Sequence, residues 1–151
     1  MDLAFFRQHS LTRGLSSSQI QNLASRLTEL RVAPGESLLV EGAECRGLFL
    51  IKEGSVRVSK GGNEIVTLAA PTVLGELELI SHDVSSAEVQ ASTDVVAYLL
   101  SRDAFDSMID AGDAIVTKMM RNVARVVIRR LRQTNSRLVS LMDERVVEAE
   151  S

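Results

Sequence analysis

The chain has 151 residues, 45% of them hydrophobic, and a formal net charge of −3. This composition fits one folded domain with one core and excludes a chain that is disordered throughout. One cysteine and two histidines exclude an internal disulfide framework and the usual histidine- and cysteine-rich metal clusters.

The beginning of the chain and its hydropathy indicate a cytoplasmic protein. Residues 1–6 lack the basic segment and the long apolar segment of a signal peptide. No stretch approaches 18 consecutive apolar residues, so we expect no membrane span.

The N-terminal part is predicted to be helical. Ser16–Ser18 can cap a helix whose apolar positions recur at helical spacing, namely Ile20, Leu23, Ala24, Leu27 and Leu30. Pro34 and Gly35 then interrupt the pattern.

From residue 36 to 101 the hydrophobic pattern predicts strands. Six short β-like runs follow each other at near-even spacing, at residues 37–40, 48–52, 56–60, 65–68, 87–90 and 95–100. Such spacing predicts a mainly β fold with flanking helices, a β-roll or jelly roll.

Two further helices are expected after the last strand. Ser101 or Asp103 can cap a short helix that Gly112 ends. From Asp113 to about Val147 there is neither proline nor glycine, which predicts one long helix. We therefore divide one structural domain into helices and roll at 1–112 and a long C-terminal helix at 113–151.

The long helix carries a heptad pattern. Apolar positions seven apart form a two-position seam that consists of Met120, Ala124, Val127, Leu131, Thr134, Leu138 and Leu141. A seam of this kind predicts parallel pairing of two identical helices, hence a homodimer. Thr134 is its polar member, and its hydroxyl either bonds back to its own helix or reaches a buried partner.

Charge is unevenly distributed along the chain. Residues 1–112 hold nine basic and fifteen acidic side chains, whereas the segment from Lys118 to Arg137 holds seven basic side chains and no acidic one. Five of them form a stripe at helical spacing: Lys118, Arg121, Arg125, Arg129 and Arg132. The stripe is either a solvated face or a docking surface for an acidic protein, a nucleic acid or a guanine-rich second messenger.

The segment around Gly75 has the chemistry of an anion site. A glycine before the helical turn Glu76-Leu77 lets backbone amides converge on a phosphate, and Glu76 is an acceptor suited to a sugar hydroxyl. An arginine on the next strand would add roughly 1.5–3 kcal/mol of charge-assisted hydrogen bonding, but Ser85 stands there. Glu88, two residues after Ser86, is expected to place a second carboxylate near the site.

These motifs resemble a known family. Residues 73–80 followed by 85–89 are similar to the phosphate-binding cassette of cyclic-nucleotide-binding domains, and residues 47–58 resemble the family's strand–turn–strand signature. The order of elements resembles the sensor half of the bacterial catabolite-activator and fumarate–nitrate regulator superfamily. That resemblance implies a double-stranded β-roll with short N-terminal helices and a long dimerisation helix.

The resemblance also implies a ligand and its contacts. Gly75, Leu77 and Ser86 would form the phosphate cradle, with Ser85 and Ala87 beside them among the ligand-binding residues. Glu76 would bind the ribose 2′-hydroxyl of cAMP, cGMP or cyclic di-GMP. Thr134 and Asn135 would approach the base, one of them from the partner subunit. Ser85 departs from the family's arginine, and Arg130, near the seam, is the first candidate to replace it.

Catalysis is not expected. Glu76 and Glu78 are two residues apart and should diverge on a helical turn, and neither has a nucleophile or metal site to serve. No helix-turn-helix segment follows residue 151, so direct DNA binding is not expected either.

Two functions remain open. The first is a homodimeric sensor that acts through a partner protein and has a weak or altered preference for cyclic nucleotides, because its cassette is degenerate. The second is a ligand-free dimeric scaffold that docks a partner through the basic helix.

Overall fold

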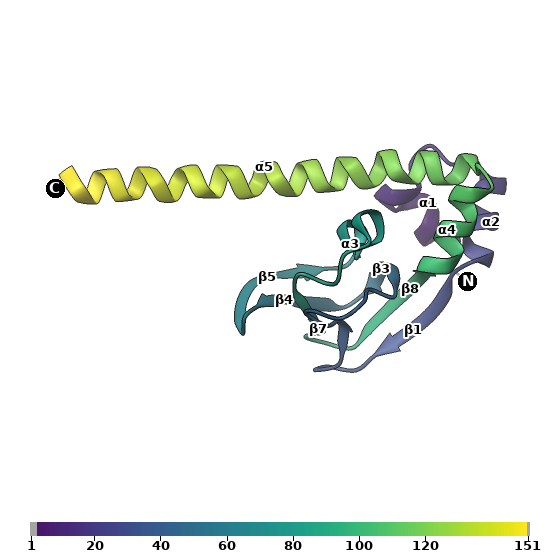
Figure 1. Cartoon of the computed structure of the whole chain (residues 1–151), viewed down its shortest axis with the longest axis horizontal. Helices are drawn as coiled ribbons and strands as arrows, with labels where there is room; N and C mark the ends of the chain where they lie inside the picture. Colours follow the sequence, from purple (N-terminus) through teal and green to yellow (C-terminus); the bar gives the residue numbers. More distant parts are fainter. Residues whose placement is uncertain (1–2, 151) are drawn as a thin grey trace.

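Residues 3–150 are described by the computed structural model, which shows a β-roll flanked by helices (Figure 1). Two antiparallel four-stranded sheets have the strand orders β1-β8-β3-β6 and β2-β7-β4-β5. The strands are β1 (Thr28–Val32), β2 (Ser37–Leu39), β3 (Gly47–Glu53), β4 (Ser55–Lys60), β5 (Asn63–Ala69), β6 (Thr72–Leu74), β7 (Glu88–Ala91) and β8 (Val95–Ser101). The predicted mainly β jelly roll is confirmed.

The core has two parts, one on each face of the first sheet. Successive side chains of a strand point to opposite faces. In β3, Phe49 and Ile51 therefore pack against the second sheet, while Leu48 and Leu50 pack against the helices. Because both faces are covered, the middle of this sheet is fully buried.

The N-terminal helices are shorter than the sequence pattern predicts. They are α1 (Leu3–Gln8), a 3-10 turn (Ser10–Thr12) and α2 (Ser17–Ser25), and Ser16 caps α2 in a reciprocal pair of hydrogen bonds with Gln19. The expectation that the helix reaches Leu30 is wrong. Leu30 lies in β1, which pairs along its whole length with β8, so sheet pairing prevails over the helical spacing.

The two C-terminal helices form where they were predicted. Helix α4 (Arg102–Asp110) begins at Ser101, whose hydroxyl accepts a hydrogen bond from the Ala104 amide at 3.1 Å. Helix α5 (Ala114–Glu150) has 37 residues and is therefore about 55 Å long. Its first part packs on the helical side of the roll, and its C-terminal part extends well beyond the roll (Figure 1). Every residue from Leu131 to Glu148 is exposed.

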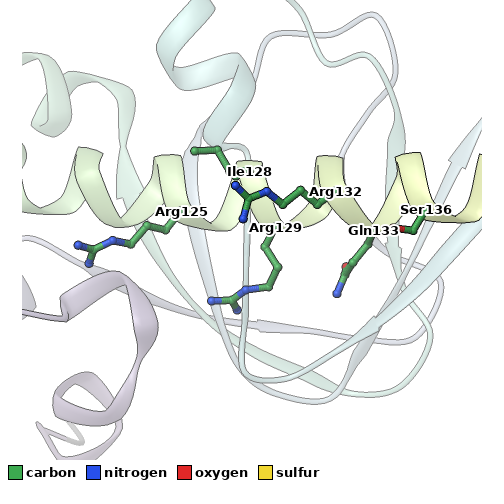
Figure 2. Close-up of a pocket in the computed structure, with 6 residues that line it drawn as sticks. All are labelled: Arg125, Ile128, Arg129, Arg132, Gln133 and Ser136. Carbon is green, nitrogen blue, oxygen red and sulfur yellow. The ribbon is translucent and has the colours of Figure 1, made fainter.

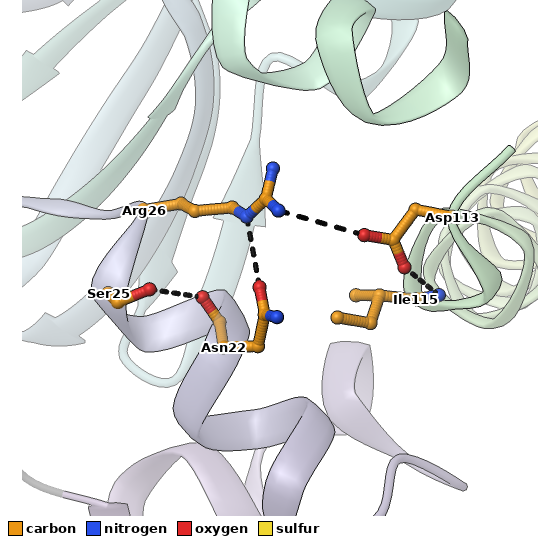
Figure 3. Close-up of polar contacts among 5 residues, drawn as sticks. All are labelled: Asn22, Ser25, Arg26, Asp113 and Ile115. Carbon is orange, nitrogen blue, oxygen red and sulfur yellow. Dashed lines mark hydrogen bonds and ion pairs between the residues drawn. The ribbon is translucent and has the colours of Figure 1, made fainter. Parts of the chain in front are cut away.

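The start of α5 is tied to α2 by polar contacts (Figure 3). Asp113 accepts a hydrogen bond from the Ile115 amide at 2.9 Å and lies 3.9 Å from the Arg26 guanidinium. Arg26 in turn donates from Nε to Asn22 at 3.0 Å. These contacts fix where α5 begins relative to the N-terminal helices.

A buried amide holds the next turns of α5. Asn122 is only 2% exposed, and its Nδ2 donates to the carbonyls of Leu11 at 2.6 Å and Arg13 at 2.9 Å. The first half of α5 is therefore a fixed part of the fold, unlike the exposed half that follows.

Within residues 3–150 no helix combines the length and the apolar character that a membrane crossing requires. The same residues contain no group of three metal-ligating side chains.

Candidate ligand-binding site

A cavity of about 300 Å³ lies between the roll, helix α3 (Glu76–Ser81) and helix α5. The second sheet provides its apolar wall, and α3 and α5 provide its charged groups. Its lining residues are Leu39, Val58, Ile65, Val66, Leu68, Leu74, Gly75, Glu76, Leu77, Glu78, Ser86, Ala87, Val89, Arg130, Gln133, Thr134 and Arg137. Seven of the nine predicted ligand residues are among them, and Ser85 and Asn135 are not.

Gly75 shapes the turn that leads into α3. Its φ is +84°, in the left-handed region that favours glycine. A Cβ at this position would lie 2.4 Å from the carbonyl oxygen of Gly47, closer than any real contact. The absence of a side chain therefore lets α3 begin directly against β3, which brings Glu76 to the cavity.

Glu76 and Arg130 join the cassette to the long helix. Nη1 of Arg130 donates to Oε1 of Glu76, and its Nη2 donates to the hydroxyl of Thr72 at 3.0 Å and the carbonyl of Val73 at 2.8 Å. The side chain of Glu76 is 6% exposed and that of Arg130 is 33% exposed. The guanidinium thus neutralises the buried carboxylate rather than facing an open anion site.

The ionisation of Glu76 reflects these surroundings. Burial raises the pKa of Glu76 above its usual value, and the nearby charge of Glu78 adds to this rise. Arg130 acts in the opposite direction, because a cation favours the charged carboxylate.

Glu78 was not predicted as a site residue. It is 7% exposed and lines the cavity beside Glu76, so the expectation that the two carboxylates diverge is wrong. The intervening Leu77 is 53% exposed, and the short helix turns both acids toward the roll. The sequence Glu76-Leu77-Glu78, in which one apolar residue separates two acidic ones, is the signal that could have identified Glu78 as a site residue.

Ser85 is buried, not part of the cavity wall. It is 2% exposed, and its backbone pairs with the loop after β2 through Gly42 and Ala43, at 2.8 Å each. Its hydroxyl has no hydrogen-bond partner among the described residues. The position therefore offers no charge to a ligand.

Glu88 does not add charge to the cavity, so that expectation is wrong. Its carboxylate accepts hydrogen bonds from the Ser37 hydroxyl at 2.5 Å and the Glu41 amide at 2.9 Å. These two donors lower the pKa of Glu88. The side chain is thus held by β2 and the residues that follow it.

Helix α5 supplies more cavity residues than the sequence suggested. Thr134 lines the cavity, and its hydroxyl donates to the Arg130 carbonyl at 2.9 Å, one of the two roles foreseen for it. Asn135, the next residue, is exposed and is not part of the wall. Gln133 and Arg137 were missed, although their spacing of three and seven from Arg130 places them on one helix face.

The basic stripe lies on another face of α5. Figure 2 shows the side chains of Arg125 and Arg129 extending to the same side of the helix, beside a groove of about 700 Å³. Lys118 is already engaged, because its ammonium donates to the Gly14 carbonyl at 3.0 Å and to Gln19 at 2.9 Å.

The predicted seam divides into two parts. Met120 and Val127 pack against the core on the helical side of the roll. Leu131, Leu138 and Leu141 are 57%, 55% and 54% exposed, and Ala124 and Thr134 are exposed as well.

Curated relatives share the roll. The cGMP-dependent protein kinase egl-4 of Caenorhabditis elegans is 32% identical over 99 residues, which are 66% of this chain and 13% of the kinase. A CRP-like cAMP-activated global transcriptional regulator of Mycobacterium tuberculosis is 27% identical over 135 residues, 86% of this chain and 58% of the regulator. The chain thus spans from about an eighth to somewhat over half the length of these relatives.

Solved structures share the fold as well. A cyclic nucleotide-binding domain from Methylobacillus flagellatus has a TM-score of 0.78 at 23% identity, over 91% of this chain and 80% of that one. The regulatory subunit of a cAMP-independent protein kinase A from Trypanosoma cruzi, bound to guanosine, has a TM-score of 0.66 at 24% identity, over 85% and 49%.

The counterpart from Trypanosoma brucei has also been solved as a triple mutant with cAMP in its A site. Its TM-score is 0.70 at 24% identity, over 91% of this chain and 48% of that one. In that mutant a glutamate is replaced by alanine, and a threonine seven positions later by arginine.

The family described as "Cyclic nucleotide-binding domain" matches residues 29–111, which is more than half of the chain and extends from Glu29 in β1 to the end of α4. The match contains the turn at Gly75, the two carboxylates of α3 and the strand that follows Ser85. The chain belongs to the cyclic nucleotide-binding domain family.

Proposed function

We propose that this chain is a homodimeric sensor in which a ribose-bearing ligand occupies the cavity between the roll and α5. Binding changes the position of α5, and a partner protein responds to that change. The chain itself performs no catalysis in this proposal. The observation that carries it is the hydrogen bond from Arg130 of α5 to Glu76 of the cassette.

This contact gives a ligand a means to act on the helix. Glu76 is the acceptor suited to a ribose hydroxyl, and Arg130 already occupies it. A ligand that binds Glu76 must rearrange or share this contact, so its affinity differs between two positions of α5. A ligand shifts a conformational equilibrium only through such a difference in affinity.

The cassette departs from one suited to a cyclic monophosphate. Ser85 provides no charge, and Glu78 adds a carboxylate to the wall. The Trypanosoma brucei mutant that binds cAMP has exchanged a glutamate and a threonine seven positions apart, the same separation as between Glu78 and Ser85. The guanosine complex from Trypanosoma cruzi further supports a ligand preference that differs from cAMP or cGMP.

Dimerisation is proposed from the exposed half of α5. Most helical stability in proteins comes from packing of an apolar face rather than from intrinsic helix propensity. Beyond Arg130 the helix presents exposed apolar side chains, including Leu131, Leu138 and Met142. A second copy of the same helix would cover them.

Isothermal titration of the purified chain tests the sensor function. We expect measurable binding of at least one ribose ligand among cAMP, cGMP, cyclic di-GMP and the corresponding nucleosides at moderate salt. An absence of heat and of any thermal shift with all of them at millimolar concentration would contradict the sensor.

The second candidate is a ligand-free scaffold that docks an acidic partner along the basic stripe. The observation in its favour is that the side chains of Arg129 and Arg132 make no hydrogen bond or ion pair in the described part of the chain. A chain that binds no ribose ligand but retains its dimer would favour this function.

A further inference from the structure

Four charged side chains line the cavity, but only two of them, Glu76 and Arg130, form an ion pair with each other. Glu76 is neutralised by Arg130, which also holds Thr72 and Val73. Glu78 and Arg137 remain, and no hydrogen bond or ion pair joins them to each other or to another described side chain. A ligand therefore meets one spare carboxylate on α3 and one spare guanidinium on α5.

The spare carboxylate lies in the cassette itself. Glu78 is 7% exposed, two residues after the proposed ribose acceptor Glu76. A buried carboxylate repels a phosphate more strongly than an exposed one, because water screens it less. Ser85, the position from which an arginine could oppose this repulsion, is a buried neutral side chain. The cassette thus disfavours a phosphate on its sugar.

An uncharged nucleoside suits the same groups better. Its 3′- and 5′-hydroxyls can donate hydrogen bonds, whereas in a cyclic monophosphate both oxygens are esterified and cannot donate. A carboxylate only accepts hydrogen bonds, so Glu78 gains a partner from a nucleoside and none from the cyclic phosphate.

Arg137 also lines the cavity and comes from α5. It is two helical turns from Arg130, which corresponds to about 10 Å along the helix axis. The apolar residues that line the cavity include Ile65 and Val66 of β5, and an apolar wall suits a planar base. A guanidinium matches the N7 and O6 acceptors of guanine, whereas adenine has a donor at the second of these places.

We propose that the cavity binds an uncharged purine nucleoside, with guanosine preferred over adenosine. Glu78 accepts hydrogen bonds from the sugar hydroxyls and excludes a cyclic phosphate, and Arg137 binds the base edge. This inference rests on the proposed sensor function and names the ligand class of the same site.

The test is titration of the full chain with four probes: guanosine, adenosine, cGMP and cAMP. We expect guanosine to bind at least tenfold more tightly than cGMP and several-fold more tightly than adenosine. Glu78→Ala should weaken the binding of guanosine at least tenfold and strengthen the binding of cGMP. Arg137→Gln should remove the preference for guanosine over adenosine.

Two controls separate these effects from general damage. Asp83→Ala removes an exposed carboxylate just after α3, outside the cavity wall, and should leave all four affinities unchanged. Circular dichroism on heating establishes that each variant is folded.

The outcomes distinguish the two proposals. Tighter binding of cGMP than of guanosine by the wild-type chain would overturn the nucleoside inference and leave the sensor function standing. Guanosine binding that Glu78→Ala does not change would overturn the role of Glu78. An absence of binding by all four probes would overturn the nucleoside inference, and the sensor function would fall as well if cyclic di-GMP also gave no heat.

Discussion

Arg130 and Glu76 stand 54 positions apart in the chain, yet they form an ion pair that joins the roll to α5 in the wall of the cavity. The pair gives Glu76 a cation that its burial requires, and it gives α5 a polar contact to the cassette.

We expect Arg130→Gln to lower the free energy of unfolding at pH 8 by about 2 kcal/mol. Removing one partner of a buried ion pair leaves an uncompensated charge, and the partial exposure of Arg130 reduces the loss. Because the folded-state pKa of Glu76 is raised, its contribution to stability is present below pH 4.5 and is lost as the pH rises through the folded value. Arg130→Gln raises the folded-state pKa of Glu76 further, because it removes the cation. The variant therefore loses more stability than the wild type as the pH rises.

Urea unfolding at pH 4 and pH 8 measures this effect. The difference in the free energy of unfolding between Arg130→Gln and wild type should be small at pH 4 and large at pH 8. Arg129→Gln, on the outer face of α5, should behave as wild type at both. An equal loss at the two pH values would show that the ionisation of Glu76 is not involved.

Gly75→Ala should destabilise the fold by about 2 kcal/mol or more. The new Cβ has to adopt a left-handed conformation and would also collide with the Gly47 carbonyl. Gly112→Ala is the matched control: its φ is +65°, but no atom lies within 4 Å of its Cβ, so we expect only about 1 kcal/mol. Thermal unfolding followed by circular dichroism compares them, and equal losses would contradict the close packing of α3 on β3.

Leu131→Asp should convert the proposed dimer to a monomer, because it places a charge at the apolar seam. Light scattering coupled to size exclusion measures the mass directly. Ser136→Asp introduces the same charge at an exposed position that lines the groove of the basic stripe, so it should leave the dimer intact. A dimer that survives Leu131→Asp would refute the seam.

Ser85→Arg should strengthen binding of cAMP or cGMP by about tenfold, equivalent to roughly 1.4 kcal/mol, through charge-assisted hydrogen bonds to the phosphate. The gain should be larger in combination with Glu78→Ala, because the repelling carboxylate is then absent. Titration calorimetry measures both. Ser81→Arg adds the same charge at an exposed end of α3 and should give little gain.

His9 should make the fold sensitive to mild acid. Burial lowers the pKa of His9, with the backbone of Thr72 acting in the opposite direction. The folded chain thus resists the proton that the unfolded chain takes up below about pH 6.5. The free energy of unfolding therefore decreases as the pH falls below that value. Because only one proton on His9 is involved, the decrease is at most about 1.4 kcal/mol per pH unit.

Chemical unfolding between pH 7 and pH 5 tests this dependence. His9→Asn retains an acceptor for the Leu11 amide, which His9 now caps at 3.1 Å, and should flatten the profile. His82→Asn replaces the other histidine, which is exposed and occupies a left-handed position that asparagine tolerates. It should retain the wild-type slope, and an identical slope in His9→Asn would assign the effect elsewhere.

Local signals in the sequence predicted much of the fold. Glycine turns and alternating strands are short-range features, so the roll, the position of Gly75 and the extent of α5 could be inferred. The strand position of Leu30 could not be inferred, because its helical spacing competes with strand pairing. Its partner in β8 is Ala97, which lies 67 positions away in the sequence.

The site was predictable to the degree that its residues belong to one segment. Glu76 and Ser86 belong to the cassette and were found. Glu78 was missed because the way a short helix packs decides which side chains are buried, and this depends on the roll beneath it. Gln133 and Arg137 were missed because the rotation of α5 about its axis is set by distant anchors such as Asn122.

In the proposed sensor, the exposed half of α5 would convert a small rearrangement at the cavity into a larger displacement at the far end of the helix. The helix packs on the fold as far as Val127, touches the cassette at Arg130 and then continues for twenty residues to Glu150, about 30 Å. A tilt of about 5° pivoting at Arg130 would displace that far end by roughly 2.6 Å, as a lever of this length requires. Because the ion pair lies at the start of this exposed segment, a small change of angle there would move the far end of α5 further than the residues at the cavity.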